Sequence, residues 1–294
     1  MHCLSFCVGD SIAGNFKKKE IMGRVAIVLL WVMSLTWSNR VLAQPQIFTL
    51  GVSEGSSGSL DHMQAVAKYR GFAELIGRAL KSKVNIVFSR GFEQLEDGMK
   101  TGRLDFVMAR PSDYPARGMR DHGYNFVASA KPDGHCLILV PKGSALQSLN
   151  DIKGKQIVFP EEISYMSRFC AAELRTQGIV VAKEKVQFVR DQAAIAYFLD
   201  NRLVDVGAVA SYSGVAKKLE KDGNRILHRS VAQPFFPMVA NRRISAEQIK
   251  AIRTEMLAMT ASDAGREILK TIGVDQFDTS AEPKMRELLE WLKI

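Results

Sequence analysis

The sequence predicts an α/β fold built from two similar halves. Short apolar runs alternate with longer segments in which apolar residues recur every three or four positions. This alternation is typical of parallel strands joined by helices. It forms two successive strand–helix–strand–helix–strand series, and the 251 residues after residue 43 are enough for two cores. We therefore expect two lobes, each a mainly parallel sheet flanked by helices.

The first series starts with an apolar run, Ile47 to Val52, which predicts a strand. In the segment that follows, up to residue 80, apolar side chains recur on one helical face, and this predicts a long helix. Those side chains are Leu60, Met63, Val66, Tyr69, Phe72, Ile76 and Leu80. The other elements expected in this series are a strand at 84–89, a helix at 92–101 and a strand at 104–109.

The second series follows a predicted crossing between the lobes. Strands are expected at 124–130 and 136–140, and Lys131-Pro132-Asp133-Gly134 between them favours a turn, which we take as the first crossing. The later expected elements are a strand at 156–159, a helix at 164–177, a strand at 186–189, a helix at 191–200, a strand at 204–210, a helix ending near 221, strands at 225–229 and 238–241, and helices at 245–259, 264–272 and 283–292. Lobe 1 is thus expected to comprise residues 44–130 and 226–294, and lobe 2 residues 131–225.

An apolar run near the N-terminus predicts a secretory signal peptide. Val25 to Trp37 follows basic residues and precedes Val41-Leu42-Ala43, which resembles a small-residue cleavage site. The run is shorter than the roughly 20 residues that span a bilayer. We expect residues 1–43 to be removed, with Met22 as an alternative start; an uncleaved anchor is the competing interpretation. No cysteine follows the cleavage site, which argues against a lipoprotein.

Composition excludes several classes of function. The whole chain carries a net charge of +9, and without residues 1–43 it keeps 35 Lys/Arg against 29 Asp/Glu, or +6. This modest excess suits either a solvated basic surface or a protein that attracts anions. No basic block interleaved with aromatic residues indicates nucleic-acid binding. The histidines after the leader lack the spacing of metal ligands, so we expect no metal and no cofactor. They are His62, His122, His135 and His228.

Two cysteines, Cys136 and Cys170, remain after the leader. An exported protein enters a compartment that permits disulfides. The apolar neighbours of both residues also suit a core strand and a core helix, where free cysteines are common. One disulfide and two buried thiols are therefore equally compatible with the sequence.

Gly51-Val52-Ser53-Glu54-Gly55 matches the nucleophile elbow of α/β hydrolases. A secreted serine hydrolase that uses Ser53 is therefore one alternative. In that fold several strands precede the elbow, whereas only seven residues separate Ala43 from Gly51. We expect instead a Gly/Ser loop, with Ser53 and Ser57 as ligand contacts, that leads into a helix N-terminus able to hold an anion.

Polar side chains also follow the predicted strands of both series. Ligands of open α/β sheets bind at the carboxyl ends of strands, so these side chains are candidate ligand contacts. A helix cap is the competing role for a serine such as Ser164. The candidates are Arg110, Ser112, Tyr114, Ser164, Tyr165, Arg190 and Ser211.

Two motifs resemble the phosphate/phosphonate-binding family of ABC importers, which are type II periplasmic binding proteins. The family pattern GxxDxxxxxPxxY is matched by Gly102 to Tyr114, and DLKGKxxxF is similar to Asp151 to Phe159. The resemblance covers most of residues 47–272. It implies a two-lobed fold with the ligand cleft between the lobes, and it implies ligand contacts for Ser112, Tyr114 and Tyr69.

The chain departs from that family in its anion-cradling residues. The family cradle reads Ser-Thr-Ser-Gly, whereas this chain has Ser164-Tyr165-Met166-Ser167. Arg110 replaces a glycine, and Arg190 replaces a histidine. Fewer hydroxyls weaken the recognition of a tetrahedral oxyanion, while arginines keep attraction for phosphate or carboxylate. The expected ligand is therefore still an anion.

The resemblance implies a periplasmic solute-binding protein and not an enzyme. Such a protein captures a small anionic ligand, here a phosphate- or phosphonate-like oxyanion or a carboxylate, by lobe closure. Its partner would be the permease of an ABC transporter, and we expect a monomer. Two other interpretations remain open: a ligand-sensing component for a membrane signalling protein, and a degenerate member that binds a protein partner.

Overall fold

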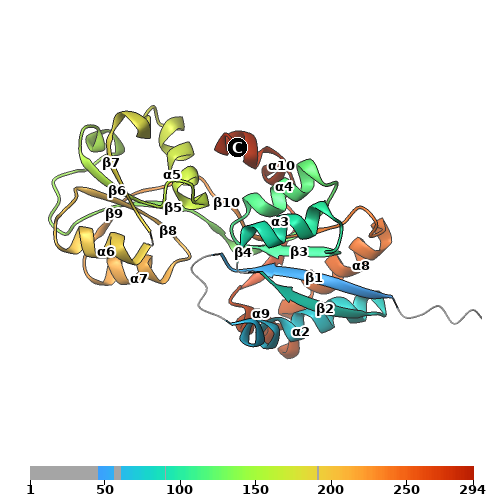
Figure 1. Ribbon diagram of the computed structural model, residues 1–294. Helices are drawn as coiled ribbons and strands as arrows, with labels where there is room; N and C mark the ends of the chain where they lie inside the picture. Colours follow the sequence, from blue (N-terminus) through green and yellow to red (C-terminus); the bar gives the residue numbers. More distant parts are fainter. Residues whose placement is uncertain (1–45, 56–60, 90, 191) are drawn as a thin grey trace, which may run out of the picture. The chain divides into compact units, whose positions relative to one another are not determined.

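The computed structural model describes residues 46–55, 61–89, 91–190 and 192–294 (Figure 1). The predicted leader and its cleavage site lie outside these residues, as does Ser57. Within the described chain two sheets carry helices, which confirms the α/β class.

The first sheet has six strands in the order β11-β4-β10-β3-β1-β2. They are β1 (Ile47–Ser53), β2 (Lys83–Phe88), β3 (Phe106–Ala109), β4 (Asn125–Gly134), β10 (Gln233–Ala240) and β11 (Gln276–Asp278). β1 pairs in parallel with β2 and β3, as a βαβαβ unit requires. β10 pairs antiparallel with β3 and β4, and β4 pairs antiparallel with β11.

The second sheet has five strands in the order β7-β6-β8-β5-β9. They are β5 (Cys136–Val140), β6 (Gln156–Pro160), β7 (Lys185–Val189), β8 (Val206–Ala210) and β9 (Arg225–Arg229). β6 is parallel to β7 and β8, whereas β5 is antiparallel to β8 and β9. Both sheets are thus mixed rather than mainly parallel. β10 and β11 run against the other strands of the first sheet, and β5 runs against the other strands of the second.

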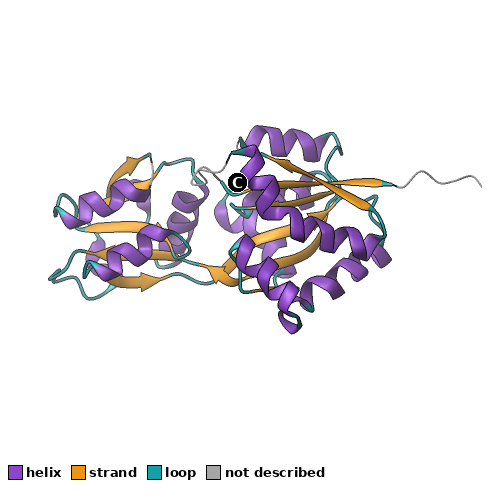
Figure 2. Cartoon of the chain, turned by 90° about the horizontal axis from the view of Figure 1, so that it is seen from below, coloured by secondary structure: helices purple, strands orange, loops and turns teal. Residues whose placement is uncertain are grey.

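Helices pack against the strands of each sheet (Figure 2). They are α2 (His62–Leu80), α3 (Phe92–Lys100), α4 (Asp113–Asp121), α5 (Tyr165–Thr176), α6 (Gln192–Asp200), α7 (Gly214–Lys221), α8 (Ala246–Leu257), α9 (Asp263–Ile272) and α10 (Glu282–Leu292). Local sequence signals fix several of their ends. Asp61 and Ser245 cap α2 and α8 in capping boxes, and Gly273 ends α9 in the left-handed conformation.

The apolar faces predicted from periodicity form the cores. Tyr69, Phe72 and Ile76 of α2 are fully buried in a cluster on the first sheet. In the second half, Phe159 of β6 and Phe169 of α5 are fully buried in a separate cluster. Buried aromatic side chains supply much of the apolar area in both clusters.

The predicted turn at Lys131 to Gly134 is wrong. β4 runs through these residues, because β10 pairs with it as far as Gly134 and β11 pairs with it at Lys131. Sheet pairing on both sides outweighs the local turn preference of the sequence. Two elements, α4 and β11, were not predicted from the sequence, and β10 begins at Gln233, five residues before the predicted start at Met238.

The crossing between the sheets is short. β4 ends at Gly134 and β5 begins at Cys136, so one residue joins them. The return, between β9 and β10, takes three residues. The two crossings are joined to each other, since His135 Nδ1 lies 2.8 Å from the carbonyl oxygen of Ser230 and the Cys136 N–H donates to Ser230 Oγ at 2.8 Å.

Cys136 and Cys170 form a disulfide, which decides between the two states that the sequence left open. It links β5 to α5, and both residues are fully buried. α10 also contacts α5, and it contacts α4 on the side of the first sheet. Its buried side chains are Met285, Leu288, Leu289 and Leu292.

Candidate functional site

The loop after β3 is held in place by hydrogen bonds to two other strands. The Arg110 N–H donates to the carbonyl oxygen of Ser53, at the end of β1, over 2.9 Å. Ser112 is buried, and its Oγ donates to the carbonyl oxygen of Pro234 in β10 at 2.6 Å. These bonds hold the segment from Arg110 to Ser112 at the carboxyl ends of β1 and β3, where ligands of α/β sheets bind.

Glu54, directly after β1, is the centre of a buried ion-pair cluster. Its side chain is 6% exposed and contacts three donors: Tyr69 Oη at 2.5 Å, Lys68 Nζ at 2.6 Å and Arg110 Nη2 at 2.7 Å. Burial alone would raise the pKa of Glu54, but the hydrogen bonds from Lys68 and Tyr69 and the charge of Arg110 outweigh it and lower that pKa. Glu54 is therefore held ionised.

The same cluster accounts for the predicted contact Tyr69. Burial raises the pKa of the Tyr69 phenol far above its ordinary value, and the neighbouring Glu54 carboxylate raises it further. Tyr69 is therefore a neutral donor to Glu54. The structure thus brings together two of the predicted site residues, Tyr69 and Arg110, through Glu54, which was not among the predicted site residues.

Arg110 is only partly paired. Its guanidinium lies over the rings of Phe235 and Phe236, 5.8 and 5.3 Å from their centroids. Its Nε is buried and has no hydrogen-bond partner among the described residues. One N–H of this arginine is therefore available to an acceptor from outside the described chain.

Asp113 and Tyr165 carry two further unpartnered buried atoms. Asp113 begins α4 and is 6% exposed, and its Oδ1 has no hydrogen-bond partner in the described part of the chain. Tyr165, the first residue of α5, is also buried; its Oη has no hydrogen bond of ordinary geometry among the described residues, although it interacts with the side chain of Ser112. Electrostatic interaction couples Asp113, Tyr165 and Tyr212, and also couples Tyr212 to Arg110. We call Arg110, Asp113 and Tyr165 the open group.

Burial sets the protonation of this region. It raises the pKa of Asp113 to about 6, against the opposing effect of the Arg117 and Arg168 charges. It also holds the pKa of Tyr165 well above its ordinary value and raises that of Tyr212 to about 12. At neutral pH the tyrosines are therefore neutral, and Asp113 titrates just below neutrality.

The raised pKa of Asp113 predicts an unusual pH dependence of stability. Because the folded protein holds this proton more tightly than the unfolded chain, the contribution of Asp113 to the free energy of unfolding falls as pH rises from about 4 to about 6, by about 3 kcal/mol in all. Asp113→Asn should remove that fall. Urea unfolding of both proteins across this range measures it, and identical pH profiles would contradict the assignment.

Unpaired buried polar atoms are costly, at about 1–3 kcal/mol each. Such atoms in a native protein commonly find their partner in a bound molecule or an ordered water. The open group offers one donor that cannot accept, Arg110 Nε, one carboxylate oxygen and one hydroxyl. This set can hold a small polar anion that contacts both the β3 loop and the start of α5.

The remaining predicted site residues are more dispersed. Ser53 is fully buried, and its Oγ accepts from the Gly55 N–H at 3.3 Å. Ser164 caps α5 by accepting from the Ser167 N–H at 3.2 Å. Ser211 Oγ accepts from the His135 N–H at 3.0 Å.

Two further predicted ligand contacts, Tyr114 and Arg190, do not belong to the open group. Tyr114 stacks on Phe92 of α3, with centroids 4.4 Å apart, and burial raises its pKa to about 12. Arg190 follows β7 and is exposed, and among the described residues no hydrogen bond or ion pair holds its guanidinium.

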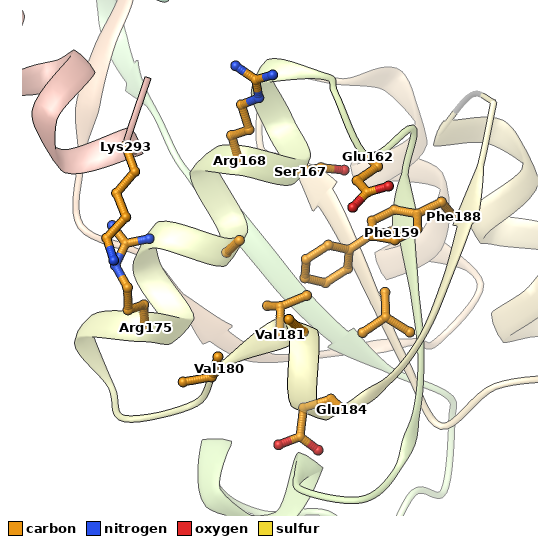
Figure 3. A pocket seen from close by; sticks show the side chains of 13 residues that line it. Phe159, Glu162, Ser167, Arg168, Arg175, Val180, Val181, Glu184, Phe188 and Lys293 are labelled. Atoms are coloured by element: carbon orange, nitrogen blue, oxygen red, sulfur yellow. The ribbon is translucent and has the colours of Figure 1, made fainter.

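A cavity of about 460 Å³ lies beside α5, away from most of the predicted residues (Figure 3). Phe159 and Phe188 pack edge to face there, and Arg168 and Glu162 lie on its border. Another bordering residue, Glu184, already accepts from the Gly154 N–H at 2.6 Å. The cavity contains none of the open group, so the unpartnered atoms locate the candidate site better than this hollow does.

The described residues contain neither a cluster of metal ligands nor a helix suited to cross a membrane. No three or more His, Cys, Asp and Glu side chains in them gather as a metal site. None of the helices that the structure describes has both the length and the apolar character needed to cross a bilayer.

Several solved structures share the fold. XAC2383 from Xanthomonas citri, bound to ATP, has a TM-score of 0.66 at 16% identity, covering 84% of this chain and 97% of that one. PhnD1 from Prochlorococcus marinus, in complex with methylphosphonate, has a TM-score of 0.62 at 14% identity, covering 85% and 98%. The aliphatic sulphonate binding protein SsuA from Escherichia coli has a TM-score of 0.54 at 18% identity, covering 84% and 79%. At these identities the similarity shows the fold, that of type II periplasmic binding proteins.

The family itself is shown by the sequence. No curated protein matches the chain. In contrast, the sequence model of the periplasmic substrate-binding proteins of phosphonate ABC transporters matches residues 58–283, which is most of the chain and includes both motifs noted above. This match confirms the resemblance and the substrate-binding role of the family. The chain therefore belongs to the family of periplasmic substrate-binding proteins of phosphonate ABC transporters.

Proposed function

We propose that this protein binds a small phosphorus oxyanion of the phosphonate or phosphate class at the open group and delivers it to the permease of an ABC transporter. The observation that carries the proposal is the presence of unpartnered buried polar atoms on both the β3 loop and the start of α5. A ligand that pairs with both segments would stabilise the conformation in which they face each other. The methylphosphonate and ATP bound to two structural relatives are phosphorus oxyanions, which supports this ligand class.

The proposed lobes follow the sheets. The expected boundaries then shift by a few residues, because β4 of the first sheet runs to Gly134 and β9, in the second sheet, runs to Arg229. Residues 44–134 and 233–294 would form the lobe of the first sheet, and residues 136–229 that of the second. The chain would act by capture alone. Ser53, the nucleophile of the alternative hydrolase interpretation, is fully buried and holds the Gly55 N–H, which is unlike the exposed serine of a nucleophile elbow.

The first experiment is native mass spectrometry of the full chain expressed in a Gram-negative host and purified from periplasm. We expect a monomer. Under denaturing conditions its mass should be that of a chain that begins at Gln44, and under native conditions its mass should be higher by that of a small phosphorus-containing anion. A mature chain that still carries the leader would overturn the proposed cleavage. A ligand without an anionic group would overturn the proposed ligand class.

The transporter role and the sensing role differ in what happens to the ligand. If the partner is a permease, deleting the gene should abolish uptake of labelled ligand by the native host, because capture then limits transport. If the protein is instead a sensing component for a membrane signalling protein, deleting the gene should change gene expression while uptake of the labelled ligand continues.

Replacing Arg110 should weaken ligand binding. A charge-assisted hydrogen bond is worth about 1.5–3 kcal/mol, so Arg110→Gln is expected to lower methylphosphonate affinity by about 10- to 100-fold in titration calorimetry. Arg103→Gln is the matched control, since Arg103 lies just before β3, exposed and paired only with neighbouring side chains. Equal affinity of the Arg110 and Arg103 variants would place the ligand elsewhere.

A further inference from the structure

The strand β10 is irregular where it passes the loop after β3. It lies between β4 and β3 in the first sheet, yet its residues 234–237 read Pro-Phe-Phe-Pro. A proline has no N–H to donate to a neighbouring strand, so prolines inside a sheet are typical of bulges. The register with β4 shifts between Phe235 and Met238, and the pairing with β3 starts at Met238. We call the segment 234–237 the β10 bulge.

Phe236, within the β10 bulge, has a left-handed backbone. Its φ is +48°, which a bulky side chain rarely adopts. Among the described residues, the other non-glycine residues of this kind, Lys81, Arg202 and Lys293, lie within two residues after a helix, where this conformation is common. In a regular strand the side chain of Phe236 and that of its neighbour Phe235 would point to opposite faces. Here the centroids of the two buried rings lie 6.1 Å apart.

The bulge brings both rings to the guanidinium of Arg110. The Cζ of Arg110 lies over the ring of Phe235 at 5.8 Å and over that of Phe236 at 5.3 Å from the centroids. Glu54 accepts from Nη2 of the same group at 2.7 Å. Two rings and one carboxylate thus fix where the guanidinium lies and how it is turned. They leave its Nε without a hydrogen-bond partner in the described chain.

The bulge also holds the backbone that carries Arg110. The carbonyl oxygen of Pro234 accepts from Ser112 Oγ at 2.6 Å, two residues after Arg110. A regular ladder would direct such a carbonyl to a neighbouring strand, whereas a bulge locally disrupts the ladder. The β10 bulge therefore contacts the loop after β3 twice, once through the main chain and once through the two rings.

We propose that the β10 bulge positions the ligand-binding arginine: Phe235 and Phe236 hold the guanidinium of Arg110 in one orientation, with its Nε–H presented to an oxygen of the ligand. The inference rests on the function proposed above and deepens it. An arginine that is already oriented loses less conformational freedom when the ligand arrives, so binding is tighter. The left-handed backbone of Phe236 fits this role, because strained backbone of this kind clusters at ligand sites.

Phe236→Leu tests the proposal, because leucine keeps an apolar side chain but lacks the ring beside the cation. We expect it to weaken methylphosphonate binding by about tenfold in titration calorimetry. Phe277→Leu is the matched control. Phe277 is also a buried ring of the first sheet, but it stacks on Phe72, with centroids 5.5 Å apart. Its replacement should leave the affinity within about twofold of the wild type.

A double-mutant cycle separates positioning from a general loss of structure. In Arg110→Gln the guanidinium is absent, so adding Phe236→Leu should change the affinity by less than about twofold. Arg110→Lys gives a second readout. Lysine keeps the charge but not the planar group that the rings orient, so this variant should bind methylphosphonate about as weakly as Arg110→Gln. Circular dichroism verifies the fold of each variant, and Phe235→Leu replaces Phe236→Leu if the latter does not fold.

The outcomes separate this proposal from the proposed function. Wild-type affinity in Phe236→Leu, or an equal loss from this change with and without Arg110, overturns the positioning role while leaving the oxyanion site intact. Wild-type affinity in Arg110→Lys also overturns it, because charge alone would then be sufficient. Failure of the wild-type protein to bind methylphosphonate and inorganic phosphate overturns the proposed function itself.

Discussion

Replacing Cys136 and Cys170 together by serine is expected to lower the free energy of unfolding by about 4 kcal/mol. The disulfide closes a loop between residues 34 positions apart, and in the chain-entropy model such a cross-link restricts the unfolded chain by about that amount. Both residues are fully buried, so the serine hydroxyls also lose water on folding. Urea unfolding of the oxidised wild type and of the double variant measures the difference.

The effect has a matched control in the wild-type protein. Reducing the disulfide with a thiol reagent should reproduce most of the loss without a sequence change. Because α5 begins at Tyr165, five residues before Cys170, the double variant should also bind ligand less tightly. If the double variant and the oxidised wild type unfold at the same urea concentration, the stabilising role of the disulfide is contradicted.

Glu54→Gln is expected to destabilise the protein by about 3–5 kcal/mol. Glu54 neutralises Lys68 and Arg110 in a buried setting, and removing one partner of such a cluster leaves cations without compensation. Glutamine keeps the size and the acceptor oxygen for Tyr69 but loses the charge. Glu74→Gln, on the exposed side of α2, is the matched control and should change stability by less than about 0.5 kcal/mol.

The pH dependence of this variant distinguishes charge from packing. The pKa of Glu54 is lowered in the folded protein, so its stabilisation is present at neutral pH and is lost as pH falls from the ordinary value near 4.5 through the lower folded value. The difference in unfolding free energy between wild type and Glu54→Gln should therefore shrink in that acidic range. A difference that stays constant there would indicate a packing defect.

Periodicity predicted most elements, because helices such as α2 bury a regular stripe that can be read from the sequence. It failed where pairing decides the structure. β4 passes through Lys131 to Gly134, and β11 forms only because β4 offers a free edge. α4 was missed because its sequence, from Asp113 to Asp121, contains a proline and is strongly polar.

The candidate site could be predicted in part. Arg110, Ser112 and Tyr165 stand at strand ends, and the rule for open sheets selects them. Asp113 directly follows Ser112 and Glu54 directly follows β1, but an acidic residue gives no local signal of burial. The one hint for Glu54 was its position directly after the predicted first strand, next to Ser53, which is the nucleophile position of the hydrolase motif. Whether Cys136 and Cys170 pair depends on a distance in space, which spacing along the chain does not give.

The short crossings between the sheets restrict how the two halves can move. With one residue between β4 and β5 and three between β9 and β10, there is no slack along either connection. Ser230 fastens the two crossings to each other through its carbonyl and its hydroxyl. Sliding of one half along the other would stretch both crossings, whereas rotation about their common line changes only a few backbone torsions. Short connections of this kind therefore favour bending of the two halves over sliding.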